Sequence, residues 1–232
     1  MLSSDVKDFL AQGIETMGLH LHNRAEALTR LTQYFHELRK WNRKVNLVAR
    51  TLDDRQILEN HFLDSLTLLS VLDRENMETE TLLDVGTGAG FPGLVLKAAC
   101  PQLQVVLVEP RGNRYYFLKH IVRNLDLRKV ELFNMRLEES SEQKELSGRK
   151  FSVITSRAFT DISRFVRLTS SYLVQHGRIV CMKGPGADRE LTGLTCIGLP
   201  EKFYVADIRK LQLPYSKAER ILVVIRISDN KI

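Results

Sequence analysis

The sequence lacks the features that mark a secreted, disulfide-rich or membrane-spanning protein. Its three cysteines, Cys100, Cys181 and Cys196, never form a Cys-x-x-Cys pair, so we expect no disulfide framework, no zinc site and no other metal. No apolar run approaches the roughly 18 to 20 residues that a transmembrane helix needs. The start, Met-Leu-Ser-Ser-Asp, lacks the basic-then-apolar pattern of a secretory signal. We therefore expect a cytoplasmic protein without membrane association.

Acidic residues are scarce around three groups of Lys and Arg. The chain has 34 Lys and Arg against 28 Asp and Glu, a net charge of +6. Five cations occur over residues 39–50 without an acid, six face two acids over 109–129, and five face one over 149–167. One such group alone is often only a solvated surface, but several together suit RNA, because neutralised phosphates release counterions. The residues that we expect to contact RNA are Arg43, Lys44, Arg111, Arg114 and Lys183.

The spacing of apolar residues changes along the chain. In the first part they recur at intervals of three and four, as Leu28, Leu31 and Leu38 do, which predicts amphipathic helices. Later, short continuous apolar runs alternate with helical stretches, which predicts parallel strands covered on both faces. We therefore expect an N-terminal helical lobe over residues 1–75 and a Rossmann-like core over residues 76–232.

Seven segments of the core have the pattern of strands. Five predicted parallel strands cover residues 81–85, 104–108, 130–133, 151–155 and 178–182. Two further runs, 203–213 and 220–227, are joined by a short loop, which favours an antiparallel pair. The expected fold is therefore α/β: a doubly wound, seven-stranded sheet with a terminal antiparallel hairpin, its edge closed by a reversed strand.

A glycine-rich segment, Asp84-Val-Gly86-Thr-Gly88-Ala-Gly90, follows the first predicted strand and opens a helix. Such a turn, at the carboxyl edge of a doubly wound sheet, binds nucleotide-like ligands and offers them free backbone N–H groups. Glu109, at the end of the second predicted strand, is placed to accept hydrogen bonds from ribose hydroxyls. Both features alone would fit a dinucleotide just as well.

The spacing of the glycines separates the two kinds of ligand. A dinucleotide site has Gly-x-Gly-x-x-Gly, whereas this chain has Asp-x-Gly-x-Gly-x-Gly, the pattern of class I methyltransferases that bind S-adenosylmethionine. We expect that cofactor to contact Asp84, Gly86, Gly88, Gly90 and Glu109. An NAD-dependent oxidoreductase is the alternative, disfavoured because no separate substrate domain follows the sheet. A non-catalytic ribosome-binding module that keeps the fold is another.

Seven motifs occur in order from about residue 30 onward. They are Trp41-Asn42 with Asn46-Leu47, His61-x-x-Asp64-Ser65, the Asp84–Gly93 loop, Arg136-Leu-Glu138-Glu139, Ser156-Arg157-Ala158, Lys183-Gly184 and Glu219-Arg220-x-Leu-Val-Val-Ile. In these motifs the chain resembles the bacterial small-subunit ribosomal RNA methyltransferase G family, also called glucose-inhibited division protein B. The resemblance implies methylation of N7 of one guanosine in 16S rRNA. It also implies cofactor contacts at Gly86, Phe91, Leu137, Glu138 and Arg157.

Methylation at guanine N7 agrees with what the sequence lacks. N7 carries a lone pair and no proton, so no general base is needed, and the chain has neither an Asn-Pro-Pro-Tyr or Asp-Pro-Pro-Tyr segment nor a Pro-Cys dipeptide. We therefore expect no catalytic side chain in the strict sense and catalysis mainly by positioning. Because positive charge moves onto the purine, Arg157 and Lys183 are expected at O6, at phosphate or at the cofactor carboxylate rather than at N7.

Three further motif residues and the partners complete the predictions. His61 and Asp64, one helical turn apart, are expected to serve packing and capping rather than to act as a catalytic pair. Trp41 is expected in the core. The partner that we expect is 16S rRNA or the small ribosomal subunit, bound by a monomer.

Overall fold

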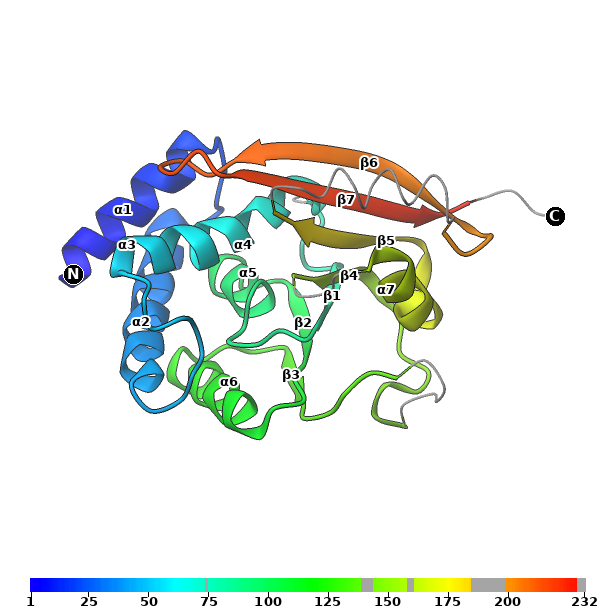
Figure 1. Ribbon diagram of the computed structural model, residues 1–232, viewed down its shortest axis with the longest axis horizontal. Coiled ribbons are helices and arrows are strands. Elements are labelled where there is room, and N and C mark those ends of the chain that lie inside the picture. The colour runs from blue at the N-terminus through cyan, green and yellow to red at the C-terminus, as the bar shows by residue number, and fades with distance from the viewer. Residues whose placement is uncertain (74, 139–143, 158–160, 185–198, 229–232) are drawn as a thin grey trace.

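The protein is described here from a computed structural model, shown in Figure 1. The structure describes all of residues 1–232 except 74, 139–143, 158–160, 185–198 and 229–232. The helices are α1 (Ser3–Thr16), α2 (Arg24–Asn42), α3 (Asp54–Ile57), α4 (Asp64–Leu66), α5 (Gly93–Ala99), α6 (Gly112–Asn124) and α7 (Ile162–Thr169). Short π or 3₁₀ segments are η1 (Leu58–Leu63), η2 (Thr67–Val71), η3 (Lys144–Leu146) and η4 (Ser170–Tyr172). The strands are β1 (Thr81–Val85), β2 (Gln104–Val108), β3 (Val130–Phe133), β4 (Phe151–Ser156), β5 (Leu173–Lys183), β6 (Phe203–Gln212) and β7 (Glu219–Ile227).

The seven described strands form one sheet in the order β3-β2-β1-β4-β5-β7-β6. β1 to β5 are parallel, and β7 is antiparallel to both β5 and β6. The predicted α/β architecture with a terminal antiparallel hairpin is confirmed. The expectation that a reversed strand closes the edge is wrong in one respect: the reversed strand β7 lies one place in, and β6 forms the edge.

The burial pattern of the hairpin gives the physical reason for this order. β7 has a continuous buried run, from Ile221 to Ile225, because its two faces pack into the two apolar clusters of the sheet. β6 alternates partly buried and exposed residues along its length, and Tyr204 and Ile208 are exposed. An alternating strand suits an edge with one solvated face.

Successive residues of the central strands point to opposite faces of the sheet and pack into two separate apolar clusters. On one face Leu82 and Val105 join a cluster with α1, α2, η1, α5 and α6. On the other face Leu83 and Val106 join a cluster with α7 and η4. The sheet is therefore covered on both sides, which explains the continuous apolar runs of its strands.

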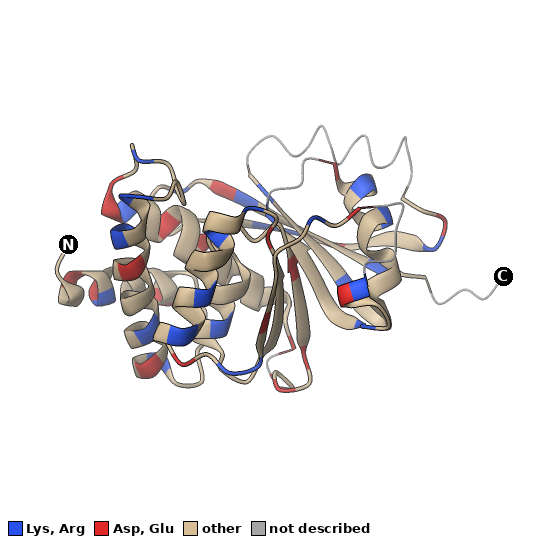
Figure 2. Ribbon diagram, turned by 90° about the horizontal axis from the view of Figure 1, so that it is seen from below, with Lys and Arg blue, Asp and Glu red and all other residues tan. Residues whose placement is uncertain are grey.

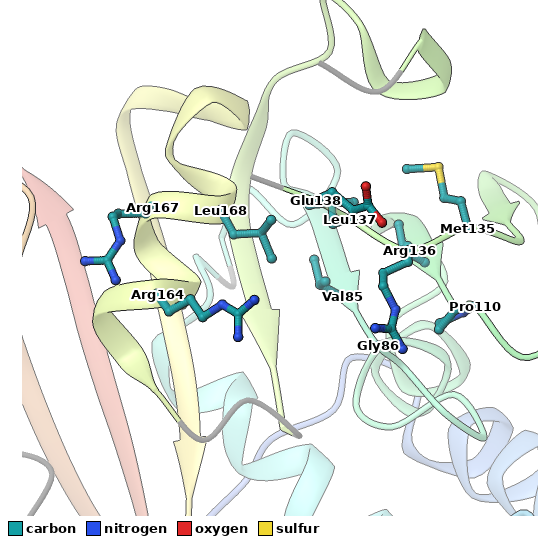
Figure 3. Close-up of a pocket in the computed structure, with 11 residues that line it drawn as sticks. Val85, Gly86, Pro110, Met135, Arg136, Leu137, Glu138, Arg164, Arg167 and Leu168 are labelled. Carbon is teal, nitrogen blue, oxygen red and sulfur yellow. The ribbon is translucent and has the colours of Figure 1, made fainter. Parts of the chain in front are cut away.

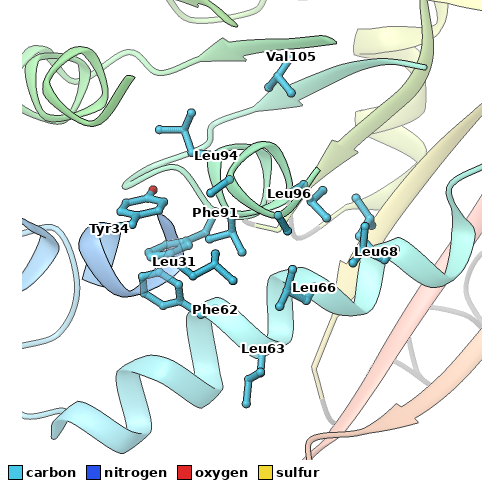
Figure 4. Close-up of a cluster of buried hydrophobic side chains, with 14 of the residues drawn as sticks. Leu31, Tyr34, Phe62, Leu63, Leu66, Leu68, Phe91, Leu94, Leu96 and Val105 are labelled. Carbon is cyan, nitrogen blue, oxygen red and sulfur yellow. The ribbon is translucent and has the colours of Figure 1, made fainter. Parts of the chain in front are cut away.

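The N-terminal helices pack on the first of these faces (Figure 1). Figure 4 shows Tyr34 of α2 beside Phe62 and Phe91, and the Tyr34 and Phe91 rings stack with centroids 6.1 Å apart. Trp41, expected in the core, is partly buried and packs against the cluster, with its ring centroid 5.6 Å from that of Phe117. The helices therefore share one apolar cluster with the sheet, while the division into lobes at residues 75 and 76 stays a prediction.

Hydropathy of the helices bears on membrane insertion. In the described ranges, no helix combines the length and the apolar composition that a bilayer crossing requires.

Candidate functional site

The glycine loop between β1 and α5 has a backbone that residues with side chains rarely adopt. Gly86, Gly88 and Gly90 have φ of +71°, +64° and +90°, in the region where a Cβ is strained. At Gly90 a Cβ would also overlap the hydroxyl oxygen of Tyr34. Local backbone and packing together therefore require glycine here.

The Asp84 carboxylate connects the two ends of this loop by hydrogen bonds. Its Oδ2 accepts hydrogen bonds from the Thr87 hydroxyl at 2.5 Å and the Gly93 N–H at 2.8 Å. The side chain is fully buried, and burial raises its pKa to about 6 against the opposing effect of those hydrogen bonds. Oδ1 is buried without a hydrogen-bond partner among the described residues. Asp84 thus shapes the loop from inside the protein.

Glu109 connects the same loop to the next strand. Its Oε2 accepts from the Gly88 N–H at 2.8 Å, and its Oε1 accepts from the Arg111 N–H at 2.9 Å. The residue is 3% exposed. Each carboxylate oxygen has two lone pairs, so both retain the capacity to accept a hydrogen bond from a ligand.

A cavity of about 840 Å³ opens at the carboxyl ends of β1 and β2, a volume that suits a small-molecule ligand. Its described lining residues are Val85, Gly86, Val108, Pro110, Met135, Arg136, Leu137, Glu138, Arg164, Arg167 and Leu168. A Cβ added to Gly86 would meet no described atom within 4 Å, so the Gly86 backbone can be approached closely. Figure 3 shows the cavity between α7 and the segment after β3, with Arg164 extending from α7 toward its centre.

Arg157, at the carboxyl end of β4, lies in a second cluster beside the glycine loop. It donates hydrogen bonds to the Asn60 carbonyl at 3.0 Å and to His61 Nδ1 at 2.8 Å, and its Nη1 lies 3.3 Å from Asp64 Oδ2. Its guanidinium carbon lies 5.1 Å from the centre of the Phe91 ring. The prediction that His61 and Asp64 serve packing is incomplete, because both bind the Arg157 side chain.

The structure brings only some of the predicted cofactor residues to the cavity. Gly86, Leu137 and Glu138 line it, and Glu109 and Asp84 support the loop beside it. The others fall outside its described lining: Gly88, Gly90, Phe91 and Arg157. Sequence reasoning did not single out Arg164, Arg167 and Leu168 of α7, although the two arginines belong to the cation group over residues 149–167.

The predicted RNA-binding cations lie on several elements of the fold. Arg43 and Lys44 are exposed just beyond the end of α2, and Arg111 is exposed before α6. Arg114 is partly buried, with Nη1 3.6 Å from the position of a Cβ on Gly88, and Lys183 ends β5 and is also partly buried. Figure 2 shows Lys and Arg on the helices on both sides of the sheet. RNA contact at these residues stays a prediction.

The sheet order and the loop define the fold class of the methyltransferases known as class I. A ribosomal protein L11 methylase from Lactobacillus delbrueckii subsp. bulgaricus has a similar structure, with a TM-score of 0.53 at 13% identity over 73% of this chain and 79% of that one. A precorrin-6y C5,15-methyltransferase from Geobacter metallireducens GS-15 has a TM-score of 0.52 at 11% identity over 78% of this chain and 92% of that one. At these identities the likeness concerns the fold alone.

Sequence comparison gives the family. The model of the family described as rRNA small subunit methyltransferase G matches residues 27–220. Proteins named ribosomal RNA small subunit methyltransferase G are similar to most of the chain. That of Desulfotalea psychrophila is 43% identical over 97% of this chain and 100% of the relative, and that of Myxococcus xanthus 38% identical over 94% and 95%. The chain belongs to this family.

These matches decide between the predictions made from the motifs. The predicted methyltransferase family is confirmed. Neither the NAD-dependent oxidoreductase nor the non-catalytic ribosome-binding module is supported by them.

Proposed function

We propose that the protein transfers a methyl group from S-adenosylmethionine to N7 of a guanosine in 16S rRNA of the small ribosomal subunit. Membership of the rRNA small subunit methyltransferase G family supports the reaction class and the kind of RNA. The observation that carries the site is the open backbone of Gly86 beside a cavity of about 840 Å³.

The cavity fits a nucleoside cofactor in three ways. Gly86 leaves room for close approach, because a Cβ there would project into free space. Apolar Val85, Val108 and Leu137 line the walls, as a purine requires. Beside the cavity, at the end of β2, Glu109 retains lone pairs for ribose hydroxyls. When bound, S-adenosylmethionine supplies an electrophilic methyl group on a sulfonium.

The chain's own residues act in this reaction by binding and orientation. Guanine N7 has a lone pair and no proton, so no side chain has to remove one. Holding the two reacting groups in line can lower the barrier by roughly 7 to 11 kcal/mol. Arg157, which keeps a quarter of its side chain exposed, and Lys183 at the end of β5 orient the purine or the cofactor carboxylate. Their charge stays away from N7, where it would oppose the positive charge that develops.

The cations around the site bind the RNA backbone in this proposal. Arg43, Lys44 and Arg111 are exposed, and contacts from such residues to phosphates make binding depend on salt. Since ribosomal RNA is the substrate, the protein acts in the cytoplasm, and we propose that it does so as a monomer.

The proposal is tested by methyl transfer to ribosomal particles. Small subunits from cells that lack the protein are incubated with tritiated S-adenosylmethionine and the purified chain, and the rRNA nucleosides are separated. We expect label in 16S rRNA as N7-methylguanosine, and none in subunits from cells that contain the protein, where the position is already methylated. Absence of label in every form of small-subunit RNA would refute the proposal.

A further inference from the structure

The guanidinium of Arg157 is held by three of its five N–H donors. Nη1 donates to the Asn60 carbonyl at 3.0 Å and lies 3.3 Å from Asp64 Oδ2, and Nη2 donates to His61 Nδ1 at 2.8 Å. A guanidinium has five N–H groups, so Nε–H and one N–H on Nη2 find no acceptor in the described parts of the chain. Two neighbouring donors of this kind suit a carboxylate, a phosphate or guanine O6.

The contact with Arg157 fixes the protonation of His61. A guanidinium has donors and no acceptor, so His61 Nδ1 must carry a lone pair and the ring proton must sit on Nε2. Burial and the charges of Arg157 and Arg220 lower the pKa of His61 to about 3. The ring is therefore neutral near neutral pH, with Nδ1 as an acceptor.

This tautomer of His61 leaves the N–H on Nε2 unpaired, which costs stability. Nε2 is buried and has no hydrogen-bond partner among the described residues. A buried donor without an acceptor costs about 1 to 3 kcal/mol. Such a cost is expected where a residue serves a site rather than stability.

Two neighbours limit the movement of both groups. The His61 ring stacks on Phe91 with centroids 5.0 Å apart and an interplanar angle of 17°, and Arg157 contacts the same Phe91 ring. Asp64 is shared, because its Oδ1 accepts from Arg220 Nε at 2.8 Å while Arg157 lies 3.3 Å from its Oδ2. At 2.8 Å, His61 Nδ1 is the nearest of the three acceptors that contact Arg157.

We propose that His61 is a positioning residue, whose neutral ring accepts a hydrogen bond from Arg157 and thereby directs two remaining guanidinium donors toward the ligand. The inference rests on the proposed function, since it takes Arg157 to contact cofactor or substrate. In this role His61 acts through Arg157 and not by its own contact with either ligand.

Two substitutions separate the hydrogen bond from the stacking. His61→Phe keeps a ring against Phe91 and removes the acceptor, whereas His61→Asn removes the ring and keeps an oxygen near the position of Nδ1. Calorimetry with S-adenosylhomocysteine and kcat/KM for methyl transfer are measured for both. We expect His61→Phe to lower the affinity for S-adenosylhomocysteine or the kcat/KM about tenfold or more, because one hydrogen bond to a charged group is worth that much. His61→Asn should retain most of the wild-type value. Equal losses in both variants, or no loss in His61→Phe, would overturn the proposal.

A double-mutant cycle shows whether His61 acts through Arg157. Arg157→Ala should reduce the same quantity as His61→Phe, and the double variant should be no worse than Arg157→Ala alone. Additive losses would overturn the proposal. His120→Phe is the matched control, since His120 is also a partly buried histidine in an aromatic contact, with Trp41 at 5.1 Å, and it should change neither quantity.

Nitrogen NMR of the wild-type chain gives a readout that needs neither RNA nor a folded His61→Phe variant. The His61 signals, identified by their loss in His61→Asn, should show Nδ1 without a proton and Nε2 with one from about pH 8 to about pH 5. A protonated Nδ1 would overturn the proposal. If the chain binds cofactor and satisfies the cycle but methylates no rRNA, the proposed function fails and the role of His61 stands.

Discussion

The hydroxyl oxygen of Tyr34, in α2, occupies the space that a side chain on Gly90 would need. The same hydroxyl donates a hydrogen bond to the Ala89 carbonyl, and the Tyr34 side chain is fully buried. The N-terminal helices therefore fix the shape of the glycine loop through a specific contact, in addition to covering the sheet.

This contact makes the cost of a methyl group at Gly90 depend on Tyr34. Gly90→Ala should lower the free energy of unfolding by about 3 kcal/mol, from overpacking and backbone strain together. Tyr34→Phe alone should cost about 1 kcal/mol, because it removes one hydrogen bond. Chemical denaturation should show that the double variant is more stable than the sum of the two losses predicts, since the removed oxygen makes room.

Gly148→Ala is the control for strain alone. Gly148 has φ of +71° and no described atom within 4 Å of the position of a Cβ. It should lose about 1 kcal/mol, and Tyr34→Phe should not alter that loss. Strict additivity of Gly90→Ala and Tyr34→Phe would show that the hydroxyl does not set the loop.

Gly86 should matter for the cofactor and little for the fold. Like Gly148 it has φ of +71° and open space at the position of a Cβ, so Gly86→Ala and Gly148→Ala should cost similar stability. Of these two glycines, only Gly86 is among the described residues that line the cavity. Gly86→Ala should therefore weaken S-adenosylhomocysteine binding about tenfold or more by steric exclusion. Unchanged affinity in calorimetry would place the ligand elsewhere.

Asp84 should give the folded protein a measurable pH dependence. Its pKa is raised from 3.8 to about 6, mainly by burial, so between these values the folded chain binds more protons than the unfolded chain. Its contribution to stability is therefore present below pH 3.8 and lost as the pH rises through about 6. Asp84→Asn keeps an acceptor for Thr87 and Gly93 and removes the titration.

Comparison of the wild type with Asp84→Asn separates the titration of Asp84 from that of the other carboxylates. The unfolding free energy of the wild type relative to Asp84→Asn should fall by about 2 kcal/mol from about pH 4 to about pH 7. A relative stability that is flat or rises over that range would contradict the raised pKa.

Asp64 should be required for stability, because two partly buried cations, Arg157 and Arg220, contact its carboxylate. It is 4% exposed and accepts from Arg220 while lying beside Arg157. Asp64→Ala should cost about 3 kcal/mol in chemical denaturation, because it leaves two partly buried guanidinium groups without their carboxylate. Glu15→Ala, which removes the exposed pair with Arg24, should change stability by about 1 kcal/mol or less. Similar losses in both variants would argue against the buried network.

Much of the fold could be predicted because it depends on local patterns. β1, β2 and β3 begin and end where their apolar runs do. β5 begins at Leu173 rather than at residue 178, and its polar, exposed Gln175 and His176 hid that start in the sequence. The order of β6 and β7 depends on long-range pairing, which a short loop between them leaves open.

The site was predicted in part for the same reason. Loop spacing indicated Gly86, which lines the cavity, and the end of the second strand indicated Glu109, which binds the Gly88 N–H. Contact of either residue with a cofactor stays a prediction. The contact of His61 with Arg157 joins residues 96 positions apart, and no local pattern encodes it. The wall formed by α7 has no motif of its own, so Leu168 was not identified.

The most direct measurement is the nucleoside content of small-subunit rRNA in cells that lack the protein. Mass spectrometry of 16S rRNA should show one N7-methylguanosine missing in these cells, restored by the wild-type chain and by Gly148→Val, and not by Gly86→Val. An undiminished level of N7-methylguanosine in the deletion cells would contradict the account.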